Sequence, residues 1–101
     1  MELIEILDII EEGFSDSTIS LIEQGHYNSA GLEMKNLYHA LLLGEFGRQV
    51  SNLHSGISLI VYTKSLADSL SRGEKNESAL GYFRAYLAQT RLSAKTGNTF
   101  S

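Results

Sequence analysis

The sequence predicts a small all-α protein of four to five helices, arranged as a bundle or as stacked helical hairpins, in a single domain over residues 1–101. Apolar residues recur at three- and four-residue spacings, and no sustained apolar run has the period of two that a half-buried strand requires. Glycine-containing turns separate the periodic stretches, and proline is absent. A chain of this length has room for one modest core.

The first helix is predicted from Met1 to Glu12, because its leucines and isoleucines share one side and its acids the other. Gly13 is expected to interrupt it before a short segment from Thr18 to Gln24. Candidate N-caps of that segment are Ser15, Asp16 and Ser17. Alternatively, the helix continues through Gly13 at a cost of about 1 kcal/mol relative to alanine, and the first 24 residues form one bent helix.

The second long helix is predicted from about Ser29 to Leu43. Gly25 can adopt the positive φ that ends a helix, and Asn28 or Ser29 can cap the next one. Apolar residues then recur on one face of this helix, at Ala30, Met34, Leu37 and Leu41. We therefore expect this stripe to lie at the centre of the core.

A break is predicted at Gly44–Gly47, and a third helical stretch runs from Phe46 to about Leu70. Its apolar face changes sides along its length. One face holds Val50, Leu53, Ile57 and Ile60, and the opposite face holds Leu59, Tyr62, Leu66 and Leu70. A kink at Ser55–Gly56 is expected to accommodate the change.

The last helix is predicted from Glu77 to about Lys95, with Gly73 ending the preceding helix and Asn76 as N-cap. Gly97 should end it, and residues 98–101 are expected to fray. Its core face is expected to hold Leu80, Phe83, Tyr86, Leu87 and Ala94. A second line on this helix, here called the small-residue line, consists of Gly81, Ala85, Ala88 and Leu92. Because small residues let another helix approach closely, the line predicts a contact surface.

Charge is distributed unevenly along the chain. Residues 1–34 hold eight acids and no Lys or Arg, whereas residues 35–101 hold four acids and eight bases, so the formal charges of the two parts are −8 and +4. Such parts attract one another within a monomer or between subunits, and the pattern argues against a whole-molecule nucleic-acid binder.

Three bases line one edge of the last helix, namely Arg84, Arg91 and Lys95. They are expected to meet the acidic N-terminal helix or the carboxylates of a partner, because three phosphate contacts would give only weak, salt-sensitive nucleic-acid binding. The predicted partner-binding residues are therefore Gly81, Arg84, Ala85, Ala88, Arg91, Leu92 and Lys95.

Phe14, Gly25-His26-Tyr27, Ala30 and Met34 resemble a tetratricopeptide repeat, with an aromatic residue early in its first helix and Gly-x-Tyr-x-x-Ala at its turn. The resemblance covers about Phe14 to Leu43, and a poorer second copy spans Tyr62 to Thr90. Thr18 departs from the family's small residue, and the terminal proline is missing. Glycine-terminated helical hairpins also converge on such patterns. The resemblance implies a scaffold that binds peptides or helices in a groove, as small bacterial secretion chaperones built from such repeats do.

The sequence contains no recognisable catalytic, cofactor-binding or metal-binding motif. The three histidines lie 13 and 15 residues apart, at His26, His39 and His54, with no carboxylate placed to complete a metal set. One pattern nevertheless points to an enzyme. Arg48 and His54 resemble the Arg-x(4–6)-His motif of the HEPN superfamily of dimeric helical ribonucleases, although Gln49 stands where that family has Asn, Asp or His. In such chemistry the histidine moves the 2′-hydroxyl proton and the arginine stabilises the phosphorane charge.

The sequence therefore predicts a non-enzymatic protein–protein interaction module without a cofactor, such as an adaptor, a secretion-type chaperone or an inhibitor. The alternative is a small dimeric helical ribonuclease or toxin that uses Arg48 and His54. The expected partner is another protein or a second copy of the chain. A membrane is not expected, because the longest apolar run, Ile57 to Tyr62, is far shorter than the ~20 residues that span a bilayer. The absence of cysteine fits a reducing compartment, and the cytoplasm is the expected location.

Overall fold

The computed structural model describes residues 2–97, in which every regular element is helical, and this confirms the all-α class. The elements are α1 (Leu3–Gly13), the π-helical turn η1 (Phe14–Thr18), α2 (Ile19–Glu23), α3 (Tyr27–Leu42), α4 (Gly44–Ser51), α5 (Gly56–Ser71) and α6 (Glu77–Thr96). Because α1, η1 and α2 are continuous, residues 2–97 hold five separate helices. The expectation for residues 98–101 lies outside the described residues.

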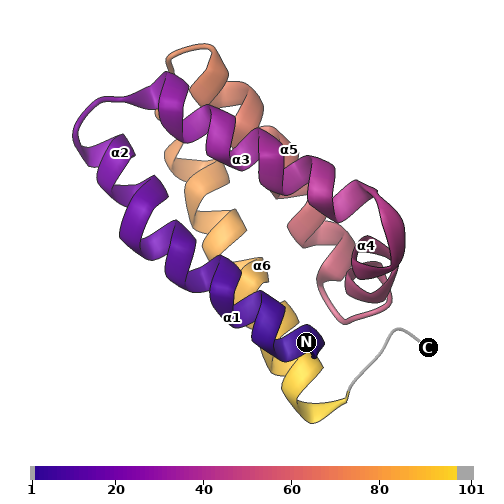
Figure 1. Cartoon of the computed structure of the whole chain (residues 1–101). Coiled ribbons are helices and arrows are strands. Elements are labelled where there is room, and N and C mark those ends of the chain that lie inside the picture. The colour runs from indigo at the N-terminus through magenta and orange to yellow at the C-terminus, as the bar shows by residue number, and fades with distance from the viewer. Residues whose placement is uncertain (1, 98–101) are drawn as a thin grey trace.

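The long helices form a bundle in which chain-distant segments lie side by side (Figure 1). α3 packs along α5, α5 along α6, and α6 along α1. η1 and α2 contact α3, whereas α1 diverges from it, and the short α4 packs at the end where α3 stops and α5 begins (Figure 1). The contact between α1 and α6 closes the bundle, and the core lies between these helices.

The interruption predicted at Gly13 is wrong, and the alternative of one continuous helix is correct. Gly13 has helical angles, φ −61° and ψ −41°, and the proposed caps Ser15, Asp16 and Ser17 lie inside η1. A hydrogen bond from the Ile19 N–H to the Phe14 carbonyl closes this turn, which therefore contains one residue more than an α-helical turn. One residue corresponds to about 100° of helix rotation, so the insertion returns Ile22 to the core face.

The predicted glycine turns are confirmed at Gly25 and Gly73, whose φ angles are +79° and +77°. In each, two backbone bonds close the end of the helix in a Schellman motif, as when the N–H of His26 donates to the Leu21 carbonyl at 2.8 Å. Asn76 is the predicted N-cap, and its side chain accepts a bond from the Ala79 N–H at 3.0 Å. The caps proposed at Asn28 and Ser29 are wrong, because the tight turn returns the chain to helix already at Tyr27.

The central stripe of α3 is confirmed as core. Ala30, Met34 and Leu41 are buried, and Leu37 packs half-buried against them. The break after α3 is narrower than predicted. Leu43 is extended and Gly44, the first residue of α4, has φ +73°, but the rest of Gly44–Gly47 lies within α4.

The kink predicted at Ser55–Gly56 is a complete break between α4 and α5. Ser55 has φ +68°, and residues 52–55 form a loop anchored to α6 by two bonds. The His54 N–H donates to Ser93 Oγ at 3.0 Å, and Ser55 Oγ donates to Gln89 Oε1 at 2.6 Å. Since α5 starts anew, Ile57 does not share the buried face of Val50 and is 54% exposed.

Thr90 in α6 is fully buried, and its Oγ1 has no hydrogen-bond partner within residues 2–97. Thr90→Val removes this unsatisfied hydroxyl, and we expect the free energy of unfolding to rise by about 1 kcal/mol. Thr63→Val is the matched control, since Thr63 is equally buried but its Oγ1 donates to the Leu59 carbonyl at 2.6 Å. Urea unfolding checks both, and a Thr90→Val protein less stable than the wild type would contradict the account.

Candidate interaction surface

The two predicted faces of α6 differ in the exposure of their side chains. The core face is buried or half-buried, at Phe83, Leu87, Leu80, Tyr86 and Ala94. The small-residue line is exposed, at Gly81, Ala85, Ala88 and Leu92, and Leu92 has 61% of its surface accessible. Within residues 2–97, no helix covers this line.

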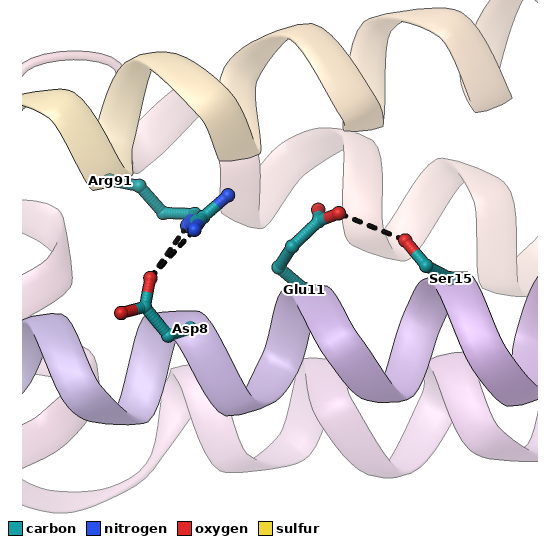
Figure 2. Close-up of polar contacts among 4 residues, drawn as sticks. All are labelled: Asp8, Glu11, Ser15 and Arg91. Atoms are coloured by element: carbon teal, nitrogen blue, oxygen red, sulfur yellow. Dashed lines mark hydrogen bonds and ion pairs between the residues drawn. The ribbon is translucent and has the colours of Figure 1, made fainter.

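Arg91 joins the basic edge of α6 to the acidic α1. Its Nε and Nη2 atoms donate to Asp8 Oδ1 at 3.0 and 2.7 Å (Figure 2). The Asp8 and Arg91 side chains remain 50% and 34% exposed, and an ion pair of this kind contributes about 0–1 kcal/mol. The pair therefore orients α1 along α6 more than it stabilises the fold, and it connects the acidic and basic parts of the chain.

A shallow hollow of about 220 Å³ lies at the seam between α1 and α6. Its lining combines apolar and charged side chains: Ile4, Asp8, Ala88, Arg91, Leu92 and Lys95. Further along the seam, Ser15 Oγ donates to Glu11 Oε1 at 2.9 Å (Figure 2). The seam thus brings four of the predicted partner-binding residues into one hollow, while Gly81, Arg84 and Ala85 lie exposed beside it on α6.

A second surface lies over α3 and α5, on another side of the bundle. One hollow there, of about 310 Å³, is lined by Lys35, Tyr38, His39, Lys64, Ala67, Asp68 and Ser71. Lys64 Nζ donates to Asp68 Oδ2 at 2.7 Å, and this bond together with the negative charge of Asp68 raises the pKa of Lys64. Large apolar side chains are also exposed towards the ends of these helices, at Leu42, Leu43, Ile57 and Val61.

The two residues of the ribonuclease alternative are held by different neighbours. Arg48, on α4, pairs with Glu45 at 3.7 Å and lines a hollow between α3, α4 and α5. His54 lies in the loop after α4, where its backbone is bonded to Ser93 of α6. Both side chains are exposed. The hollow that Arg48 lines does not include His54 among its lining residues.

The histidines and acids of residues 2–97 form no group of three that could hold a metal ion. Over the same residues, no helix combines the length and apolar character needed to cross a membrane.

Comparison with family models, with curated proteins and with solved structures gives no match for this chain. The tetratricopeptide resemblance therefore remains a prediction that rests on Phe14, Gly25, Tyr27, Ala30 and Met34.

Sequence reasoning missed a third surface, which lies beside η1. Here a small hollow of about 210 Å³ opens between η1 and α3. The hydroxyls of Ser17 and Thr18 donate to the Glu33 carboxylate at its edge. The sequence offers Ser15, Asp16 and Ser17 as helix caps before Thr18, and no sequence signal distinguishes a π-helical turn from that interpretation.

Proposed function

We propose that this chain is a cytoplasmic, non-enzymatic protein–protein interaction module, and that a partner protein or a second copy binds the solvent face of α6. The observation that carries the proposal is the exposed small-residue line, whose members Ala88 and Leu92 also line the hollow between α1 and α6. An adaptor, a secretion-type chaperone or an inhibitor would each use such a surface.

The shape of the α6 face favours a helix as the bound element. Gly81, Ala85 and Ala88 project little beyond the backbone, so a partner helix can lie close to α6 and bury Leu92. Arg84 and Lys95 flank this line and are exposed, and they favour acidic residues on the approaching helix. A second copy offers such residues on its α1, where Glu5 and Glu12 are exposed.

Ala88→Arg is expected to abolish association while the helix content of the monomer stays nearly unchanged. The new side chain adds bulk where the approach is closest, and its charge would be stranded on burial. Association is measured by sedimentation equilibrium for self-association and by capture with the tagged protein from its native source for a partner. Wild-type association should also weaken between low and high salt, because the flanking contacts are charged.

Val61→Arg provides the matched control, since Val61 is also exposed but lies on α5. We expect it to leave association unchanged. If Val61→Arg abolishes association and Ala88→Arg does not, the α6 proposal is wrong. It is equally wrong if Ala88→Arg unfolds the monomer, because the line would then be core. Cleavage of RNA by the purified protein, lost in a folded His54→Ala variant, would favour the ribonuclease alternative instead.

A further inference from the structure

The hollow beside η1 has an apolar lining with one charged group at its edge. Its apolar walls come from α1, η1 and α3, through Ile10, Phe14, Met34 and Leu37. Gly13 and Thr18 complete one side, and Glu33 supplies the charge. Pockets that enclose a drug-sized ligand measure roughly 300–1,000 Å³, so a hollow of about 210 Å³ is suited to a single large side chain.

Glu33 is held in a defined position at this hollow. Ser17 Oγ donates to its Oε2, and Thr18 Oγ1 donates to its Oε1, both at 2.8 Å. Each carboxylate oxygen therefore has one hydroxyl donor and retains capacity to accept another bond. These two hydrogen bonds depend on η1, which places both hydroxyls opposite α3. Single π-helical turns inside α-helices frequently occur at functional sites.

The charges around the hollow are of one sign. Its lining contains Glu33 and no base, and residues 1–34 contain no Lys or Arg at all. The first base in the chain, Lys35, lines the hollow between α3 and α5 instead. The carboxylate thus has no cationic partner in the lining of this hollow, and a cation brought by a ligand would be attracted to it.

We propose that this hollow is a docking site for a basic peptide segment of a partner protein, which inserts one large apolar side chain between η1 and α3 and places a Lys or Arg against Glu33. The site lies apart from the α6 face, and its existence does not depend on the contact proposed there.

Selection of a random dodecapeptide phage library on the intact protein tests the site. We expect enriched peptides to carry a Leu, Met or Phe within four positions of a Lys or Arg. An enriched peptide is then synthesised and its affinity is measured by fluorescence anisotropy. Glu33→Gln keeps the shape of the side chain and removes its charge, and it should weaken binding about two- to fivefold, as expected for a partly exposed ion pair.

Gly13→Leu should abolish binding, because the new side chain fills the hollow. A Cβ at Gly13 meets no heavy atom within 4 Å, and φ −61° suits any residue, so the variant should fold. Gly81→Leu makes the same change at an equally open helical glycine on α6, and it should leave the affinity unchanged. Thermal unfolding of each variant verifies that it is folded.

The proposal is overturned if no peptide is enriched, if the enriched peptides are acidic, or if they bind Gly13→Leu as tightly as the wild type. Loss of peptide binding in Gly81→Leu would also overturn it, because the peptide would then occupy the α6 face. Since Ala88→Arg leaves this hollow intact, failure of the α6 contact and failure of this site are separate results.

Discussion

Gly56→Ala is expected to lower the free energy of unfolding by about 3 kcal/mol or more, the largest effect of any alanine substitution at a glycine of α4, α5 or α6. A Cβ on Gly56 would overlap the backbone carbonyl of Val50, so either the end of α4 or the start of α5 must move. Movement is costly here, because Ser55 and His54 are bonded to α6 on the other side of the loop. Urea unfolding followed by far-UV circular dichroism measures the loss.

Gly81→Ala is the control for this substitution. Gly81 lies within α6, and a Cβ there meets no heavy atom within 4 Å, so the variant should gain up to about 1 kcal/mol from helix propensity. If the free energy of unfolding falls for Gly56→Ala and rises for Gly81→Ala, close backbone packing and not helix propensity determines the effect at Gly56. A Gly56→Ala protein as stable as the wild type would show that α4 and α5 do not approach each other as described.

Phe83→Ala is expected to cost about 3–5 kcal/mol, since Phe83 is the largest fully buried side chain of α6. Its ring centroid lies 4.6 Å from that of Phe14 in η1, at an interplanar angle of 47°. The substitution therefore removes core volume and the contact that holds the π-helical turn against α6. Chemical denaturation of the purified variant provides the measurement.

Leu92→Ala serves as the matched control for Phe83→Ala, because Leu92 lies on the exposed face of the same helix. Its effect on monomer stability should stay within about 0.5 kcal/mol. A loss below about 1 kcal/mol for Phe83→Ala, or an equal loss for both variants, would contradict the assignment of Phe83 to the core and of Leu92 to the surface.

Part of the candidate site could be predicted from the sequence. The spacing of Gly81, Ala85, Ala88 and Leu92 placed them on one face, because helical periodicity depends only on sequence separation. That this face is exposed depends on where α1 packs. α1 lies beside the face, with Asp8 bonded to Arg91, and leaves Ala88 and Leu92 exposed. The hollow beside η1 could not be predicted, since Glu33 and its donors Ser17 and Thr18 come from separate helices.

The sequence by itself determined the class of fold, the turns at Gly25 and Gly73, and the cap at Asn76. Each of these depends on backbone geometry and hydrogen bonds within a few residues, so local chemistry decides it. The tertiary structure alone decided that the chain passes through Gly13 as helix with a π-helical turn. Phe14 and Ile22 must both reach the core, and burial of these two side chains outweighs the small preference of one glycine for a break.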